Sequence, residues 1–403
     1  MDMPPNSLSS AQFAAYERDG FLLLRNAVTD EEIRRLESGL SRAIPVDRSL
    51  DPTAPVYPEA GRYTYATQNP ADPDLAFIIE HPAVVGPVTQ LLGDEPRLSA
   101  YVIYDRSPGG QGIPSHQDYK RWRPVGSSMN WLFAIVPFTD FDEELGRLEV
   151  APGSHHLHRV TAGNTPCLEV APAIRPDESA FIDPELRRGD LLLMNMHLWH
   201  RAPENTSNRN RVGLFNKYAG VSAPPATGWY RYGPAVQRAL TAHNQALIPT
   251  TGESAVTMTR AVLVRHRHGQ PEVLCLESEL DGRWMLPGGE AAEERAIADW
   301  DHGNVIGSLQ QHLRLQIGGE TPWMSYIGDF DEPEGVSRVY GYTVHQGRIA
   351  GETVGRWCPV AELEGSAFAF GWEPSAVARW LDPSVMRGKG LAQTQARVDQ
   401  FAY

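Results

Sequence analysis

The sequence predicts a mainly β protein with α-helices, in which a jelly roll of short strands is followed by a smaller domain of mixed strands and helices. Its 403 residues are too many for a typical single domain and suit two. With 41% hydrophobic and 21% charged residues, the chain has the ordinary composition of a globular protein and can form hydrophobic cores. Two turn-prone stretches, 219–228 and 247–254, separate two regions with different patterns of elements.

In the first region, helices precede strands. Residues 10–19 predict a short helix ended by Gly20, and residues 21–24 predict an apolar strand. The capping-box pattern of residues 29–32 opens an amphipathic helix, and another helix is predicted over 74–92, perturbed by its prolines. Five β-rich runs then alternate with turns, which predicts a sandwich or jelly roll. These runs are 99–104, 131–137, 147–151, 190–196 and 212–218.

In the second region, strands and helices are interspersed. Strands are predicted at 256–265, 273–277, 325–329 and 339–345, with helices near 305–315 and 373–381. This order predicts a smaller α/β/α domain. We place the first domain at 8–248, the second at 253–384, and a polar, mobile tail at 385–403.

The formal net charge of −14 argues against binding nucleic acid or anionic lipid through bulk electrostatics. The N-terminus lacks the basic and apolar regions of a signal peptide, and no apolar run approaches the length needed to cross a bilayer. Cys167, Cys275 and Cys358 have neither zinc-site nor redox-motif spacing. We therefore expect free thiols in a soluble, cytoplasmic protein.

His116 and Asp118 predict a metal site. Residues i and i+2 of a strand face the same side, so an imidazole and a carboxylate could meet one ion. Two histidines and one carboxylate on one face of an octahedral ion form the site of non-haem Fe(II) oxygenases, and three positions stay open for a bidentate co-substrate and O2. A His-x-Asp pair is common by chance, but His116 is the only histidine here with an acidic residue at i+2.

A third ligand has to come from a distant strand. On one strand, His197 and His200 would face opposite sides, so only one of them could point into the barrel. The run 189–200 ends at a polar turn, which suits an open metal site. Arg209 and Arg211 lead into the next strand, where an arginine can pair with the distal carboxylate of 2-oxoglutarate. The histidine candidates are His155, His156, His158, His197 and His200.

Over residues 10 to 220 the sequence resembles the phytanoyl-CoA dioxygenase family of Fe(II)/2-oxoglutarate oxygenases. The resemblance rests on residues 16–21, the His116-x-Asp118 pair, residues 146–155, and the 189–200 run with Arg211 eleven residues after His200. That last spacing selects His200 over His197 and Arg211 over Arg209. Trp122 matches an aromatic residue of the ectoine-hydroxylase-like branch, whereas Leu145-Gly146 departs from the usual Asn-Gly of a turn.

The resemblance implies a double-stranded β-helix (jelly-roll) domain in which His116, Asp118 and His200 hold Fe(II). Arg211 would bind 2-oxoglutarate, and O2 would oxidise a small-molecule substrate, of specialised metabolism, with release of succinate and CO2. Hydroxylation is the expected outcome; desaturation, ring formation and epimerisation start from the same chemistry. Asp118 argues against the related halogenases, which have a small residue there.

Roles are also predicted for several neighbouring residues, some of them with two alternatives. Asn130 is a candidate contact of the co-substrate. Tyr119 and Trp122 are candidate walls of the substrate pocket, or parts of a solvated loop anchored by the tryptophan. His197 is expected to be packed or to face the substrate. A loop-bracing or solvated role is expected for the cluster His155, His156 and His158.

In the second domain, residues 284–290 resemble the entry to a Nudix box, and the predicted elements fit a Nudix-like domain over 255–383. Active Nudix enzymes carry carboxylates on the following helix that bind Mg²⁺. Ser308, Gln311 and His312 stand at those positions here, and Glu290 precedes the helix. We expect a catalytically inactive module that recognises a ligand, supports the structure or forms a homodimer.

Two alternatives belong to other functional classes. A Nudix-type hydrolase, or a nucleotide- or ligand-binding protein, would use the β-barrel only as an accessory; the missing helix carboxylates count against the hydrolase. A non-enzymatic sensor would bind its ligand through the second domain, and the intact iron pattern counts against it.

Overall fold

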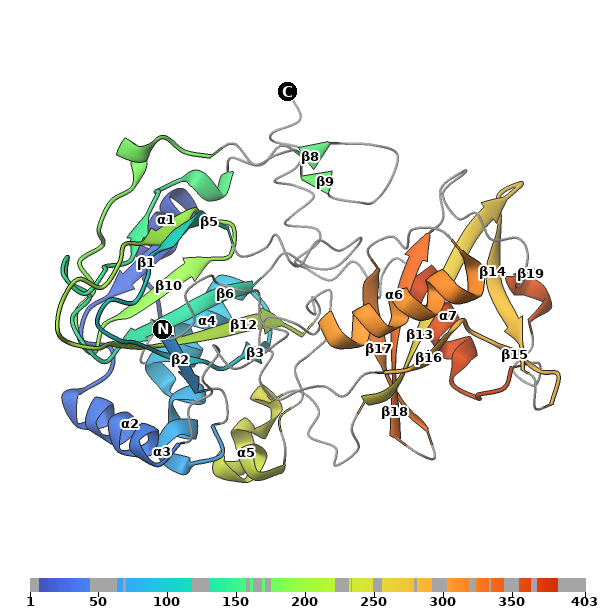
Figure 1. The fold of residues 1–403 in the computed structure, drawn as a ribbon, viewed down its shortest axis with the longest axis horizontal. Coiled ribbons are helices and arrows are strands. Elements are labelled where there is room, and N and C mark those ends of the chain that lie inside the picture. The colour runs from blue at the N-terminus through green and yellow to red at the C-terminus, as the bar shows by residue number, and fades with distance from the viewer. Residues whose placement is uncertain are drawn as a thin grey trace.

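The computed structural model describes residues 7–43, 64–67, 70–117, 131–156, 160–161, 169–170, 175–221, 232, 234–248, 256–278, 281–291, 303–318, 324–332, 335–343, 355–363 and 368–382. Within them, the elements up to residue 248 form one group with two clusters of buried apolar residues, and those from residue 256 onward form a second group (Figure 1). The expected tail at 385–403 lies outside the described residues.

The N-terminal helices begin and end where the sequence predicts. Helix α1 (Ser10–Asp19) starts with a capping box between Ser9 and Gln12 and stops at Gly20, which has a left-handed φ of 81°. Strand β1 (Phe21–Leu24) follows. Helix α2 (Asp30–Arg42) has the expected capping box between Thr29 and Glu32 and buries Ile33 and Leu36. Local signals therefore suffice for this part of the chain.

The single helix predicted over 74–92 is wrong, because the chain forms three shorter ones. They are α3 (Pro73–Ala76), η2 (Phe77–Ile79) and α4 (Pro82–Leu92). Pro82 opens α4 after an extended His81, since proline lacks the amide hydrogen that a continuous helix needs. By length and composition the stretch Pro73–Leu92 could cross a membrane, contrary to expectation, but half of it is buried inside the protein. Burial of this kind is typical of a core helix.

The larger sheet of the first domain is antiparallel, with strand order β1-β10-β6-β12-β4-β2 and β3 beside β12. Its strands after β1 are β2 (Thr64–Thr67), β3 (Pro96–Ala100), β4 (Ile103–Arg106), β6 (Trp131–Pro137), β10 (Leu191–Asn195) and β12 (Arg211–Gly220). The strand predicted at 99–104 is thus divided between β3 and β4.

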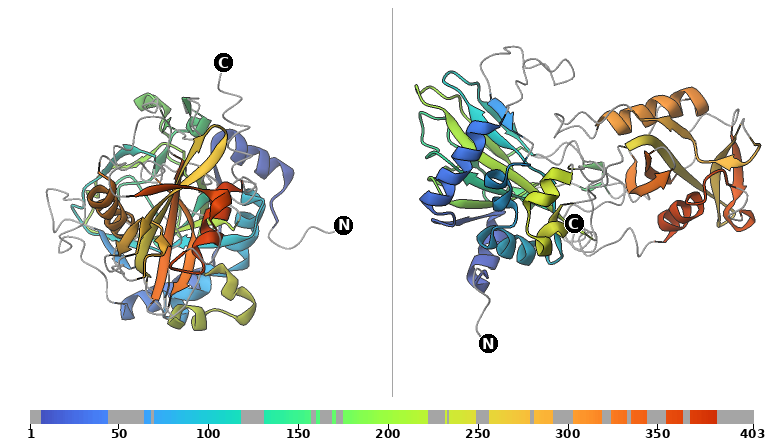
Figure 2. Two further views of the ribbon diagram at one scale, coloured as in Figure 1. Left: turned by 90° about the vertical axis from the view of Figure 1, so that its right-hand side faces the viewer. Right: turned by 90° about the horizontal axis from the view of Figure 1, so that it is seen from below.

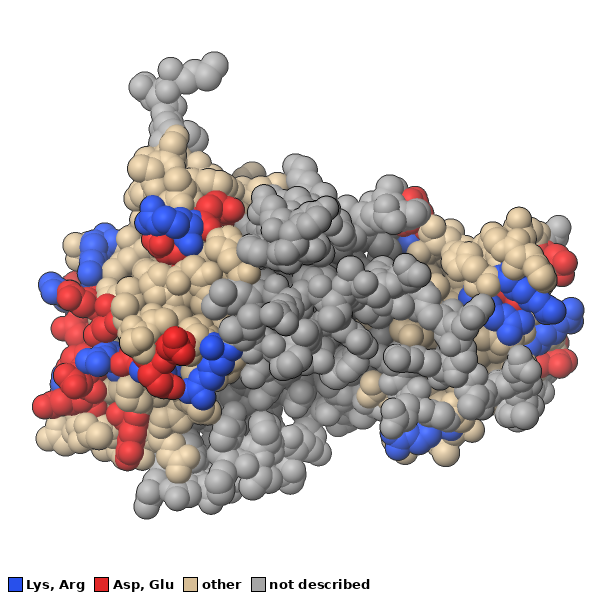
Figure 3. All heavy atoms as spheres, turned by 90° about the horizontal axis from the view of Figure 1, so that it is seen from above, with Lys and Arg blue, Asp and Glu red and all other residues tan. Residues whose placement is uncertain are grey.

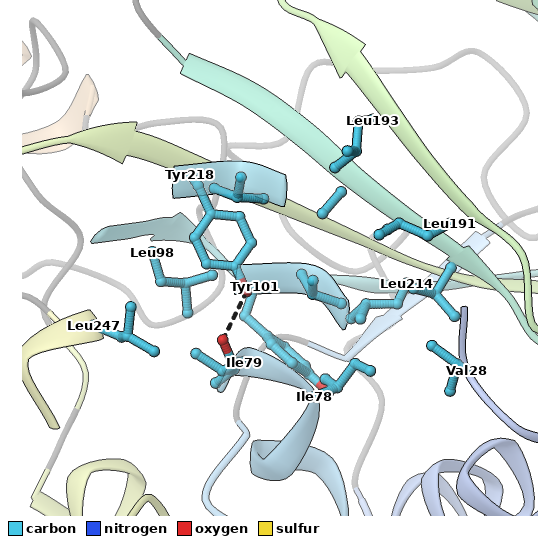
Figure 4. Packing of buried hydrophobic residues seen from close by; sticks show 14 of the residues in the cluster. Val28, Ile78, Ile79, Leu98, Tyr101, Leu191, Leu193, Leu214, Tyr218 and Leu247 are labelled. Atoms are coloured by element: carbon cyan, nitrogen blue, oxygen red, sulfur yellow. Dashed lines mark hydrogen bonds between the residues drawn. The ribbon is translucent and has the colours of Figure 1, made fainter. Parts of the chain in front are cut away.

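One face of this sheet packs on the helices, as the right-hand view of Figure 2 shows. Leu191, Leu193, Leu214 and Tyr218 point to this side, and the Tyr218 hydroxyl donates to the Ile79 carbonyl oxygen at 3.1 Å (Figure 4). The alternate residues form the opposite, inner face. That face carries Phe133, Ile135, Leu192, Met194 and Phe215.

A second, smaller sheet covers the inner face. Its order is β5 (Ile113–His116), β11 (His200–Ala202) and β7 (Glu149–Val150). Val150 and Leu148 share a cluster with the inner-face residues of the larger sheet. The two sheets therefore enclose a common core, as a jelly roll requires. The remaining elements of this domain are η4 (Ser154–His156), β8 (Val160–Thr161), β9 (Glu169–Val170), η5 (Glu178–Ala180), α5 (Pro234–Ala239) and η6 (Ala242–Leu247).

The second domain is a mixed sheet with order β15-β14-β13-β18-β17, to which β16 adds beside β13 and β19 beside β14. Along β13, Ala261 and Leu263 pack with α6, whereas Val262 and Val264 pack with α7. The helices therefore lie on opposite faces of the sheet, as Figure 2 shows, in an α/β/α arrangement. The elements are β13 (Val256–Arg267), β14 (Gln270–Glu277), β15 (Trp284–Met285), β16 (Gly288–Glu290), α6 (Gly303–Ile317), β17 (Ser325–Glu332), β18 (Gly335–Thr343), β19 (Arg356–Pro359), η7 (Val360–Glu362) and α7 (Glu373–Leu381).

On the face that Figure 3 shows, charged side chains of both signs are interspersed over the described part of the first domain. Many of them are paired; Arg188, for example, binds both Asp30 and Glu37. In the second domain, Cys275 and Cys358 are buried free thiols, and burial raises both of their pKa values. Cys167 lies outside the described residues.

Candidate active site

His116 and His200 face each other across the smaller sheet. They are direct partners in the antiparallel pairing of β5 with β11, and their ring centroids lie 4.3 Å apart. His200 is buried, and His116 is partly buried. The fold thus brings together two of the three predicted iron ligands, which are distant in sequence. Asp118, the third, lies outside the described residues.

Both imidazoles are held by the same kind of hydrogen bond. His116 Nδ1 lies 2.8 Å from the Pro114 carbonyl oxygen, and His200 Nδ1 lies 3.0 Å from the Leu198 carbonyl oxygen. A carbonyl oxygen only accepts, so each Nδ1 carries the proton and each Nε2 carries the lone pair. Histidines that bind metals through Nε2 have this backbone support at Nδ1. The arrangement fits a divalent iron ion.

The assumption that His197 and His200 share one strand is wrong. Strand β10 ends at Asn195, a turn follows, and His200 opens the separate strand β11. The Asn195 side chain accepts from the His197 amide at 2.9 Å, which stabilises the turn. His197 is buried, and its carbonyl oxygen accepts from Gln117. The pairing with His116, rather than strand parity, therefore distinguishes His200.

Arg211 is buried at the start of β12. Its guanidinium donates to the Gly146 carbonyl oxygen and lies over the Phe141 ring, 4.2 Å from the centroid. Burial holds the pKa of Arg211 well below its usual range, and the nearby Arg106 adds to this shift. Arg209, the alternative, is exposed and pairs with Asp142 at 2.6 Å. Of the two arginines, Arg211 is the one available inside the domain.

Arg106 is a residue that sequence reasoning missed. It lies directly opposite Arg211 in the pairing of β4 with β12 and is also buried. Its Nη1 donates to the Pro203 carbonyl oxygen at 2.9 Å, and burial lowers its pKa to about 10. Two adjacent buried guanidinium groups favour an anionic ligand, because each desolvated cation gains from a negative charge. Only the strand register could have revealed this neighbour.

The loop between His200 and Arg211 is supported by Asn205. Its side-chain nitrogen donates to the carbonyl oxygens of Arg106, at 3.2 Å, and Arg209, at 2.8 Å. Gly146, in the turn that departs from the family pattern, has a φ of 74°. A Cβ there would collide with the Pro203 carbonyl oxygen. This turn and the loop therefore position Arg106 and Arg211 together.

The other predicted residues divide into two groups. His155 and His156 both donate through Nε2 to the Glu17 carbonyl oxygen, at 3.1 and 2.9 Å, so they brace the end of α1 as expected. The described residues contain no cluster of three or more His, Cys, Asp or Glu side chains suited to a metal. Tyr119, Trp122, Asn130 and His158 lie outside the described residues.

In the second domain, helix α6 is tied to strand β16, which precedes it. The Gln316 side-chain amide accepts a hydrogen bond from the Gly288 N–H at 3.0 Å and donates one to the Gly288 carbonyl oxygen at 2.8 Å. His312 Nε2 donates to the Glu290 carbonyl oxygen at 2.9 Å. An amide and an imidazole of α6 thus hold β16 against the helix.

Comparison with known proteins places the first domain in a family. The family model of phytanoyl-CoA dioxygenase (PhyH) matches residues 16–213. Ectoine dioxygenase from Bordetella bronchiseptica is 30% identical over 251 residues, which cover 55% of this chain and 80% of that protein. L-proline trans-4-hydroxylase from Streptomyces griseoviridis is 28% identical over 236 residues, which cover 52% of this chain and 86% of that protein. The crystal structure of EctD from S. alaskensis is similar, with a TM-score of 0.45 and 20% sequence identity. The match covers 56% of this chain and 82% of that protein.

Proposed function

Since the chain belongs to the phytanoyl-CoA dioxygenase family and is an Fe(II)- and 2-oxoglutarate-dependent dioxygenase, we propose that it hydroxylates an unactivated carbon of a small specialised metabolite. Succinate and CO2 are the co-products. The observation that carries the proposal is the His116–His200 pair, with both Nδ1 atoms bonded to backbone carbonyls. Ectoine and L-proline, after which two of the relatives are named, are the first compounds to test.

In this proposal His116, Asp118 and His200 hold the iron, and Asn130 contributes to binding the co-substrate. Arg211, together with Arg106, binds the distal carboxylate of 2-oxoglutarate. Tyr119 and Trp122 form part of the substrate wall. Iron bound by these residues would supply the chemistry that couples oxidative decarboxylation of 2-oxoglutarate to oxidation of the substrate by O2.

The chain's own contribution is orientation and exclusion of water. The backbone carbonyls of Pro114 and Leu198 fix the ring orientation and protonation of the two histidines. Phe133 lies beside His200, with ring centroids 6.5 Å apart, and belongs to the apolar core between the sheets. A low-dielectric wall of this kind strengthens the charge interactions of a bound dicarboxylate.

The proposal extends to the rest of the protein. The second domain is a catalytically inactive Nudix-like module that recognises a ligand or forms a homodimer, and the enzyme works in the cytoplasm without nucleic-acid or membrane partners. The contact of His312 with the Glu290 carbonyl oxygen supports the inactive assignment, because an imidazole stands at a position where a metal site needs a carboxylate.

The test compares wild type with His116→Ala and His200→Ala. Iron content and 2-oxoglutarate decarboxylation, measured as succinate with and without candidate substrates, should fall by roughly 100-fold or more in both variants. His243→Ala, at an exposed histidine, is the matched control and should behave like wild type. If iron-loaded wild type neither binds nor decarboxylates 2-oxoglutarate, the proposal fails.

A further inference from the structure

A buried lysine lies on the inner face of the jelly roll. Lys217 is six residues after Arg211 on β12, so both side chains belong to the same face of the strand. It is directly opposite Phe133 in the pairing of β12 with β6 and is only 1% exposed. Its Nζ lies 5.1 Å from the centroid of the Phe133 ring. The lysine therefore contributes a positive charge to the space between the two sheets.

Phe133 links this charge to the candidate iron site. The same ring has its centroid 6.5 Å from that of His200, so Lys217 and His200 are both neighbours of one aromatic side chain. Arg211 begins the strand, roughly 20 Å away along the backbone at about 3.3 Å per residue. Lys217 is thus a second cationic position, distinct from the arginine pair at the other end of β12.

The energetics of burial indicate what such a lysine can bind. A charge in apolar surroundings acts strongly on nearby groups, because a low dielectric screens it little. An anionic group brought in by a ligand gains far more from this charge than a neutral group does, because the surroundings are apolar. The inner-face neighbours Phe133, Ile135 and Phe215 supply those surroundings.

We propose that Lys217 binds an anionic group of the substrate, a carboxylate or a phosphonate, and so orients the substrate beside His200. This proposal rests on the proposed function and narrows it to acidic or zwitterionic small molecules. Lys217 acts here as a substrate-binding residue that determines specificity.

The experiment uses the full chain loaded with Ni(II) and 2-oxoglutarate, titrated calorimetrically with acetate and methylphosphonate. Acetamide is the neutral control ligand. Wild type should bind at least one anion saturably and acetamide not at all. Lys217→Met should weaken anion binding by about 10- to 100-fold, the loss expected for one charge-assisted hydrogen bond. Arg209→Gln, which removes an exposed cation, should leave binding within about twofold of wild type.

Each other outcome overturns the proposal in a recognisable way. Absent anion binding in wild type, or binding unchanged in Lys217→Met, excludes the lysine as an anion site. A loss of 2-oxoglutarate affinity in Lys217→Met, without loss of acetate binding, assigns the lysine to the co-substrate instead. Lys217→Gln replaces the methionine variant if that variant does not fold. Failure of wild type to take up Ni(II) and 2-oxoglutarate would refute the proposed function itself.

Discussion

Arg106 lies directly opposite Arg211 on the neighbouring strand, so two guanidinium groups are buried side by side in the first domain. Their hydrogen bonds to Pro203 and Gly146 go to backbone carbonyl oxygens, which carry no net charge. Burial lowers the pKa of Arg211 well below its usual range, and the like charge of Arg106 lowers it further. A dicarboxylate would relieve the repulsion.

Replacing either arginine should weaken 2-oxoglutarate binding. We expect Arg211→Gln and Arg106→Gln each to raise the Kd for 2-oxoglutarate by about 10- to 100-fold, since each removes a charge-assisted hydrogen bond. Fluorescence or calorimetric titration of the metal-loaded protein measures this. Arg209→Gln is the control, because Arg209 is exposed and paired with Asp142. A larger effect at Arg209 than at Arg211 would contradict the assignment.

Substituting Gly146 should damage both stability and the co-substrate site. Gly146→Ala places a Cβ against the Pro203 carbonyl oxygen at a φ of 74°, so we expect a loss of about 3 kcal/mol in the free energy of unfolding. Gly153 has a φ of 73°, but a Cβ there would meet only Arg18 O, at 3.6 Å. Gly153→Ala should therefore cost about 1 kcal/mol. Denaturant unfolding distinguishes the two, and equal losses would refute the clash.

The stability of the second domain should depend on pH through Glu373. This carboxyl is fully buried and accepts from the amides of Leu286 and Phe370, at 2.6 and 3.0 Å. Burial raises its pKa from 4.5 to about 7, despite those hydrogen bonds. The folded state therefore binds the proton more tightly than the unfolded chain. This contribution to stability is complete below about pH 4.5 and is lost as the pH rises through 7.

The loss should amount to about 3 kcal/mol, since one pKa unit corresponds to about 1.4 kcal/mol. Thermal unfolding of the full chain between pH 5 and 8, followed by tryptophan fluorescence, measures it. Glu373→Gln should be less stable at pH 5 but should flatten the pH dependence. An unchanged slope in that variant would assign the pH dependence to another group.

The second domain should not hydrolyse diphosphates. With Mg²⁺ and a panel of nucleoside diphosphate derivatives, we expect no phosphate release above that of a heat-denatured control. Gln316→Glu should also destabilise the domain by about 1 to 2 kcal/mol, because a carboxylate cannot donate to the Gly288 carbonyl oxygen. Magnesium-dependent cleavage that survives His116→Ala would establish the opposite conclusion.

The sequence by itself determined the elements whose signals are local. The capping box at Thr29, the glycine at position 20 and the continuous apolar run of β6 each act within a few residues, and these elements appear where they were predicted. The same holds for α7 and for the central strand β13. The identity of His200 and Arg211 came from a family resemblance, which records spacing along the chain.

Only the tertiary structure decided which side chains are neighbours. The break at Pro82, the turn that separates His197 from His200, and the burial of Arg106 opposite Arg211 all depend on packing or strand register. The position of Lys217 beside Phe133 has the same origin. Register depends on contacts between segments far apart in sequence, and a shift of one residue would turn each side chain to the other face. Local pattern therefore predicts the strands, and their pairing determines the site.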